Sequence, residues 1–456
     1  MGKQDRTLLF EMPFNLEPPV LVNHDLGIDR ITQRGASHSF RLDLTLLDAA
    51  DHRLLRSGLT LAHRVVDGLG EWYLDAPSWG PWLPTDHSIA MAAEGDLPEE
   101  LASLVRPFRR GAPLGPVALV TCERTEYAFK DVEGVQLGVL RDDKLTIRRS
   151  GLTTARYREA TVMASGLTPV QVDFVIRGMS DAGGTRVSSF PSMVQRLGAP
   201  ATGLTDFPAP REQGKNATLE EFVSALFATR LRGLMAADLA LRSGRKSRLD
   251  ALIAQVRGLG RELDALSFAL EPTWRTQCAG LVNHVVDDVP ETVHQLGEAY
   301  FDVIDTLISA VRAPKLGNLS ARPAGSTIRQ QVEARQAILV DRCGALSTSA
   351  PDDRWTSTLV TAEQLEVLID VAAPVMGAKV DKLDKALLSL AKDLQAAQVG
   401  QGEPSFEALG LLTPQEAFEA GRVHQRSADA RILAREEFAR SWPNRKAQFA
   451  KLRVRP

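Results

Sequence analysis

The chain has 456 residues, enough for two or three domains of roughly 150 residues each. Its hydrophobic content of 44% and charged content of 24% are typical of a globular protein and exclude a disordered or fibrous chain. A net charge of −3 and a pI of about 6.3 exclude the basic excess of nucleic-acid-binding proteins. Aromatic residues make up only 6%, which disfavours base stacking on RNA. We therefore expect no sequence-specific nucleic-acid partner.

The cysteines and the N-terminus indicate the compartment. Cys122, Cys278 and Cys343 lie far apart and lack the close spacing of zinc and redox motifs. They predict buried thiols in a reducing environment. The first six residues are not followed by the apolar segment of a signal peptide, and no run of 18 apolar residues occurs. We expect a cytoplasmic chain without a membrane span.

The first half of the chain has the pattern of an antiparallel sheet with a few helices. Residues 39–46 alternate between polar and apolar, as a half-buried strand does. Residues 58–66 and 71–74 flank an Asp-Gly turn, and residues 116–129 and 135–140 flank a second turn, so each pair predicts a hairpin. Two further strands are predicted over 145–149 and 157–163, and helices over 97–105 and 168–178.

The pattern changes near residue 210. Residues 198–217 are rich in Pro and Gly, as linkers are, and apolar residues then recur at spacings of three and four. Helices are predicted over 219–241, 249–270, 293–311, 362–398 and 411–441, and residues 313–330 interrupt them. The fold class is therefore α+β: an antiparallel sheet or barrel followed by an all-α bundle. We divide the chain into 1–205, a linker 206–217, and 218–456.

The most informative chemical feature is the basic character of the helical half. No Walker loop, GxSxG, HExxH or GxGxxG motif occurs. Basic residues instead recur at helical spacing in three places, which include Arg257 and Arg261, then Lys379, Lys382 and Lys385, then Arg422 and Arg426. Each row is either a solvated helix face or part of a groove for a polyanion, because rows of Lys and Arg neutralise phosphates without reading bases.

The order of these features resembles a CYTH domain followed by a CHAD domain. Residues 46–64 resemble the CYTH stretch YFDTxDxxLxxxGxxLRxR, residues 72–77 resemble WxLKxP, and residues 158–162 resemble RELEVE. Glu123-Arg124-Thr125 resembles the RRT strand, and Asp142-Asp143 a recurrent acidic pair. The resemblance implies a β-barrel tunnel that processes triphosphates with divalent metal, with Glu11 and Glu159 as metal-binding and catalytic residues and Arg64 and Arg124 as phosphate ligands.

Several tunnel positions of that family carry other residues here. Uncharged or acidic side chains stand where the family has metal-binding acids or phosphate-binding bases: Leu9, Pro13, Ala62, Asp75, Thr121, Glu123, Val139 and Thr161. A triphosphate carries about four negative charges, and its hydrolysis requires a basic cage and Mg²⁺ or Mn²⁺ held by several oxygens. These replacements predict an inactive tunnel, and an active one would use Mg²⁺ or Mn²⁺. Asp43 and Asp48 are alternative candidates for completing the metal site.

The helical half resembles a CHAD domain, a basic bundle that binds polyphosphate. Residues 256–266 resemble HxxRVxxRRLRxxL and keep Arg257 and Arg261, while residues 379–390 correspond to HxxRxxxKRxRY with lysines retained. The match is best over residues 417–442. The resemblance implies phosphate binding by Arg257, Arg261, Lys379, Lys382, Lys385, Arg422 and Arg426.

Three hypotheses follow. The leading one is a non-catalytic protein, a pseudoenzyme that binds polyphosphate or a similar polyanion in the cytoplasm, at polyphosphate granules. The second is a triphosphatase that uses Mg²⁺ or Mn²⁺ held by Glu11 and Glu159. The third is a scaffold whose helical half mediates association into a homo-oligomer.

Overall fold

The chain forms two compact units. A computed structural model describes residues 7–17, 19–91, 95–212, 214, 216–376, 381–398 and 413–452. The sheet unit comprises Met1–Phe207 and Asp238–Ser247, and the helical unit comprises Pro208–Ala237 and Arg248–Pro456. The division therefore falls near residue 207 and again inside helix α5 (Leu219–Arg242).

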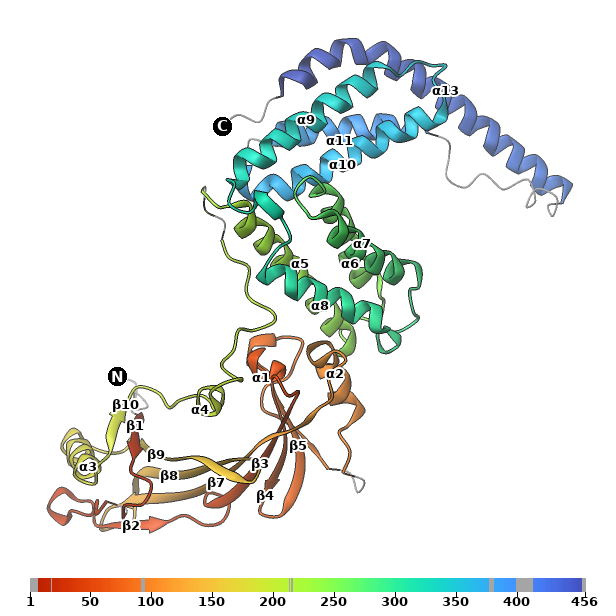
Figure 1. Ribbon diagram of the computed structural model, residues 1–456. Coiled ribbons are helices and arrows are strands. Elements are labelled where there is room, and N and C mark those ends of the chain that lie inside the picture. Colours follow the sequence, from red (N-terminus) through yellow and green to blue (C-terminus); the bar gives the residue numbers. More distant parts are fainter. Residues whose placement is uncertain are drawn as a thin grey trace. The chain divides into compact units, whose positions relative to one another are not determined.

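The sheet unit contains ten strands and four α-helices among the described residues (Figure 1). Its strands are β1 (Thr7–Met12), β2 (Arg30–Gln33), β3 (Phe40–Asp48), β4 (Thr60–Val66), β5 (Leu69–Asp75), β6 (His87–Ala90), β7 (Gly115–Lys130), β8 (Gln136–Arg149), β9 (Leu152–Met163) and β10 (Thr185–Val187). Its helices are α1 (Arg53–Arg56), α2 (Glu99–Arg109), α3 (Pro169–Asp181) and α4 (Met193–Leu197). Short 3₁₀ turns lie at His24–Leu26 and Pro77–Trp79.

The strands form an open antiparallel sheet, so the predicted closed barrel is wrong. Their order is β10-β1-β9-β8-β7-β3-β4-β5-β6, and β2 pairs with β7 outside this path. Closure requires the two end strands to pair with each other in a consistent register. In the described part of the chain, β10 and β6 are only three and four residues long and each pairs with a single neighbour.

The two faces of the sheet have separate cores. On one face, which we call the α3 face, strand residues such as Phe10, Phe129 and Val162 pack against Val172 and Val175 of α3. The opposite face, the α4 face, carries strand residues including Leu46, Ala62, Val120 and Ile147, which pack with Leu55 of α1 and Leu197 of α4. Successive residues of a strand point to opposite faces, so each strand contributes to both cores.

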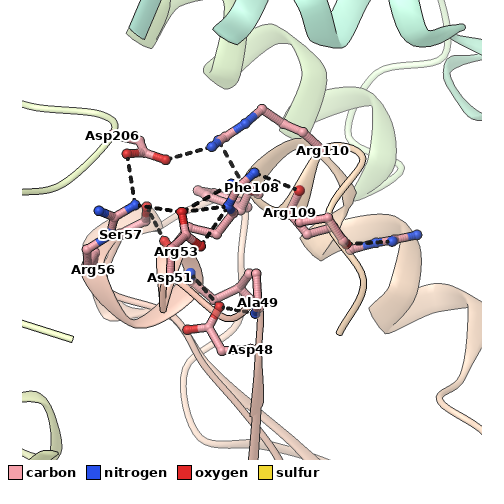
Figure 2. A network of polar contacts seen from close by, with 12 residues as sticks. Asp48, Ala49, Asp51, Arg53, Arg56, Ser57, Phe108, Arg109, Arg110 and Asp206 are labelled. Carbon is pink, nitrogen blue, oxygen red and sulfur yellow. Dashed lines mark hydrogen bonds and ion pairs between the residues drawn. The ribbon is translucent and has the colours of Figure 1, made fainter. Parts of the chain in front are cut away.

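A buried carboxylate fixes the short helix α1. Asp48 is 1% exposed, and its Oδ1 accepts hydrogen bonds from the backbone N–H groups of Ala49 (2.7 Å) and Leu54 (3.0 Å). Its Oδ2 accepts one from Leu55 (2.9 Å). Figure 2 shows this cap beside Asp206, which accepts from Arg56 and, at 2.7 Å, from Arg110. The network ties the end of the sheet unit to α1.

The helical unit is built from helix pairs. Its helices, with most of α5, are α6 (Asp250–Ala265), α7 (Pro272–Asp287), α8 (Glu298–Arg312), α9 (Ala324–Gly344), α10 (Asp352–Met376), α11 (Asp381–Ala396) and α13 (Pro414–Lys451), with 3₁₀ turns at Val293–Gln295 and Gly317–Leu319. Helix α10 packs against α6, α9 and α11, α7 packs against α6 and α8, and α13 packs against α9 and α11. None of the described helices could cross a membrane.

Several predicted elements are confirmed. The Asp67-Gly68 turn has φ angles of 49° and 86°, as a type I′ hairpin requires, and joins β4 to β5. The last helix, predicted to begin at residue 411, is α13, which starts after Thr413 with a capping box closed by Glu416. All three cysteines are free and buried, and burial raises the pKa of Cys122 and Cys343 to about 12 and that of Cys278 to about 11.

Other predicted elements are wrong. Residues 145–149 are the end of β8 rather than a separate strand. The helix predicted over 362–398 is two helices, α10 and α11, with residues 377–380 outside the described part. Helices α7 and α9 were not predicted, and α9 begins at Ala324, inside the segment expected to interrupt the bundle.

We predict that Asp48→Ala lowers the free energy of unfolding by about 2 kcal/mol, because three buried backbone N–H groups lose their acceptor. Urea denaturation measures the change. Asp173→Ala, which removes an exposed carboxylate of α3, serves as the control and should change stability by less than about 0.5 kcal/mol. Equal effects of the two variants would contradict a capping role for Asp48.

Candidate functional site

Four charged residues form a row across the α4 face of the sheet. Glu11 on β1 lies directly opposite Glu159 on β9, Glu159 lies opposite Asp143 on β8, and Asp143 lies opposite Arg124 on β7. Directly opposed residues share a face of the sheet. The structure thus brings together the predicted carboxylates Glu11 and Glu159, and it places Arg124 in the same row.

Arg124 is fully engaged by its neighbour in the row. Its Nε donates to Oδ1 of Asp143 at 2.7 Å, and its Nη2 donates to Oδ2 at 2.8 Å. The hydrogen bond to Asp143 raises the pKa of Arg124. A bidentate pair of this kind satisfies both partners, so Arg124 has little charge to offer a phosphate.

Glu159 is engaged by Arg196, a residue that no sequence pattern singled out. Arg196 lies on α4 and forms an ion pair with Glu159, and the two side chains are only 5% and 11% exposed. Its Nε donates to the carbonyl oxygen of Pro191 at 2.8 Å, and its guanidinium lies 4.9 Å from the ring centre of Tyr157. No motif marks Arg196, because its role depends on where α4 packs.

The carboxyl group of Glu159 has a raised pKa. Burial raises its pKa, the nearby carboxylates of Asp143 and Glu11 raise it further, and Arg196 lowers it. The net pKa is raised. Burial is the largest cause, so the raised pKa reflects mainly the shielding of Glu159 from water.

Glu11 borders an open pocket. The cavity has a volume of about 480 Å³ and is lined by Glu11, Tyr157, Ser189, Phe190, Pro191, Gln195 and Arg196. Glu11 is exposed and forms no hydrogen bond or ion pair with the residues that the structure describes. Its carboxylate is therefore available to a ligand.

Arg64 lies on the same face but in another row. Arg64 on β4 lies opposite Leu44 on β3, and Leu44 lies opposite Val120 on β7. Val120 comes four residues before Arg124 on the same strand, so the two arginines are in different rows. The Nε of Arg64 donates to Glu71 at 2.5 Å, its Nη2 donates to Ser88 at 2.7 Å, and its guanidinium lies 4.5 Å from the ring centre of Tyr73. The two arginines expected to grip one phosphate chain are each paired with a carboxylate instead.

The strand register sorts the replaced tunnel positions by face. Cys122 and Arg124 alternate with Thr121 and Glu123, so these last two lie on the α3 face and cannot change the charge around Glu159. The α4 face does carry other replaced positions: Leu9, Ala62, Asp75, Val139 and Thr161. All five lack a positive charge.

Most of the carboxylates expected to hold a divalent metal ion are engaged by other groups. Asp48 caps α1, and Asp43 lies on the α3 face, where Thr121 donates to it at 2.6 Å. Glu159 is held by Arg196. Among the described residues, no group of three or more His, Cys, Asp and Glu side chains could hold a metal. Mg²⁺ is held in an octahedral shell by one or two carboxylates together with water and substrate phosphates. In the row on the α4 face, the carboxylates of Glu159 and Asp143 are engaged by Arg196 and Arg124.

The predicted phosphate ligands of the helical unit differ from the sheet-unit arginines. Six of them are exposed: Arg257 and Arg261 on α6, Lys382 and Lys385 on α11, and Arg422 and Arg426 on α13. We call these six residues the helical cation set. None forms an ion pair with another described residue, and Arg422 lies 5.9 Å from the ring centre of Phe418. Lys379 lies outside the described residues.

Carboxylates lie beside part of this set. Burial raises the pKa of Glu366 and of Asp370 on α10, and the neighbouring charge of Asp384 on α11 raises both further, whereas Arg261 lowers both. The three helices α6, α10 and α11 therefore bring Arg261 into electrostatic range of an acidic cluster. The sequence does not show this proximity, since about 105 residues separate Arg261 from Glu366 in the chain.

Comparisons with known proteins gave structural matches alone. No protein-family model and no curated protein matches the chain. A putative adenylate cyclase from Bacillus halodurans matches with a TM-score of 0.23 and 13% identity, covering 38% of this chain and 96% of that chain. The CHAD domain from the plant Ricinus communis matches with a TM-score of 0.28 and 15% identity, covering 54% of this chain and 95% of that chain. At such scores no ligand, functional residue or class is transferred from either structure to this chain.

We predict that Arg196→Met lowers the free energy of unfolding by about 3 kcal/mol, because it leaves Glu159 buried without a counter-charge. Adding Glu159→Leu should restore most of the loss, since replacing both partners by apolar side chains is often neutral. Denaturant unfolding of the two single variants and the double variant measures the coupling. Additive losses would show that the two side chains act independently.

Proposed function

We propose that the chain is a non-catalytic binding protein for polyphosphate or a similar phosphorylated polyanion. The helical unit, which we assign to about residues 218–456, supplies the binding surface, and residues 1–205 form a CYTH-like unit without a functional metal site. The observation that carries this proposal is the contrast in pairing. The helical cation set is exposed and unpaired among the described residues, whereas Arg64, Arg124 and Arg196 are each bound to a carboxylate.

The contrast matters because a phosphate must compete with any carboxylate already bound to a cation. An exposed, unpaired Lys or Arg loses only hydration and counterions when it meets a phosphate. A half-buried arginine in a bidentate pair would have to leave a carboxylate unpaired in a site shielded from water, which costs several kcal/mol. Polyanion binding by the helical unit is therefore favoured over triphosphate binding on the α4 face.

We predict that the purified full chain binds long-chain polyphosphate and that the affinity falls steeply with salt, because the binding is between charged side chains and phosphates. Arg257→Gln with Arg261→Gln, and separately Lys382→Gln with Lys385→Gln, should each weaken binding at least about tenfold and reduce the salt slope by about 0.7 for each cation removed. Fluorescence anisotropy with labelled polyphosphate at several salt concentrations measures both quantities.

The matched control is Arg177→Gln with Arg186→Gln, which removes two exposed cations of the sheet unit. It should leave polyphosphate affinity unchanged. Absence of binding at moderate salt, or an equal loss of affinity in the control, would contradict the proposal. In that case, a concentration-dependent mass in size-exclusion chromatography without polyphosphate would favour the scaffold hypothesis.

We predict that polyphosphate binding tightens as the pH falls. Glu366 and Asp370 have raised pKa values, so they lose their negative charge at a higher pH than ordinary carboxyl groups do. Their protonation removes repulsion beside Arg261. Glu366→Gln with Asp370→Asn should strengthen binding at neutral pH and flatten its pH dependence.

Affinities measured from about pH 4, near the ordinary pKa of carboxyl groups, up to neutral pH test this prediction. Asp287→Asn, at the end of α7, provides a control for the loss of an exposed carboxylate. A neutralised Glu366–Asp370 variant that binds no more tightly than the control at neutral pH would show that the acidic cluster does not oppose the polyanion.

A further inference from the structure

The pocket beside Glu11 has an excess of negative charge. Glu11 and Arg196 line the pocket, and Arg196 is paired with Glu159. The pocket and this partner together contain two carboxylates and one guanidinium. The guanidinium pairs with Glu159 through Nη2 and donates from Nε to the carbonyl of Pro191, and its Nη1 is buried without a hydrogen-bond partner among the described residues. The charged group of this lining that is exposed is the carboxylate of Glu11, which forms no hydrogen bond or ion pair with another described residue. A pocket with this excess of negative charge attracts cations and repels triphosphate.

The walls of the pocket suit an organic cation. Tyr157 and Phe190 supply aromatic side chains, and Pro191 adds an apolar surface. The ring of Tyr157 already lies 4.9 Å from the guanidinium of Arg196, so its electron-rich face is used to stabilise positive charge. Ser189 and Gln195 add polar groups to the lining. Carboxylate, aromatic ring and apolar wall together match an alkylammonium ion better than a metal ion, which needs several oxygens.

We propose that this pocket binds a small organic ammonium ion. The ammonium N–H groups donate to the Glu11 carboxylate, and the attached carbon chain packs against Tyr157, Phe190 and Pro191. The site is separate from the helical cation set and takes a ligand of opposite charge. Its success or failure is therefore independent of polyphosphate binding.

The test titrates the full chain with n-butylammonium and, in parallel, with neutral 1-butanol, using isothermal titration calorimetry. We expect saturable binding of butylammonium and none of butanol. Glu11→Gln keeps the shape of the side chain and removes its charge, so it should weaken butylammonium binding at least about tenfold. Tyr157→Leu should weaken it severalfold.

Glu123→Gln is the matched control, because Glu123 is an exposed carboxylate on the opposite face of the same sheet. It should bind butylammonium as the unaltered chain does. The proposal is overturned if butylammonium does not bind, if Glu11→Gln binds it as tightly as the control, or if tripolyphosphate displaces it. Displacement by micromolar Mn²⁺ would also overturn it and would identify a metal site instead.

Discussion

The ion pair between Arg196 and Glu159 sets the charge of the α4 face. If the guanidinium of Arg196 were absent, three carboxylates on adjacent strands would share Arg124 as their partner. These carboxylates belong to Glu11, Glu159 and Asp143. Like charges on directly opposed strand positions are destabilising, and burial increases the cost. Helix α4 supplies the missing cation and covers the apolar part of the same face with Leu197. The stability of this face and its ligand preference therefore depend on where α4 docks.

The two units place their cations in different physical environments. In the sheet unit, strands hold side chains in fixed rows about 5 Å apart, so an arginine on one strand meets a carboxylate on the next. Arg64 with Glu71 and Arg124 with Asp143 are such pairs. In the helical unit, the stripes Leu383–Leu394 and Phe438–Phe449 face the interior, and the side chains of the helical cation set are exposed to water. The predicted phosphate ligands Arg64 and Arg124 are thus paired with carboxylates, whereas the helical cation set is exposed.

Local patterns were predicted well where a single physical signal controls the structure. The Asp67-Gly68 turn depends only on two neighbouring residues with positive φ. The start of α13 depends only on Thr413 and Pro414, which act within the first turn of that helix. Helices α7 and α9 escaped prediction because their apolar stripes are narrow, and α9 even buries Gln336, whose side chain donates to the carbonyl of Phe449. The barrel was predicted wrongly because closure depends on how end strands meet, which alternation along one strand does not encode.

The sequence by itself determined which residues carry charge, which of them recur on one helix face, and that a sheet-forming half precedes a helical half. It also identified Glu11, Glu159 and the basic helices as the chemically informative residues. Only the tertiary structure decided which charges are free. Arg196 is 37 residues from Glu159 in the chain, and about 105 residues separate Arg261 from Glu366, so neither encounter is visible in local spacing. Charge neutralisation depends on distance in space, which the packing of α4 on the sheet and of α6 on α10 sets.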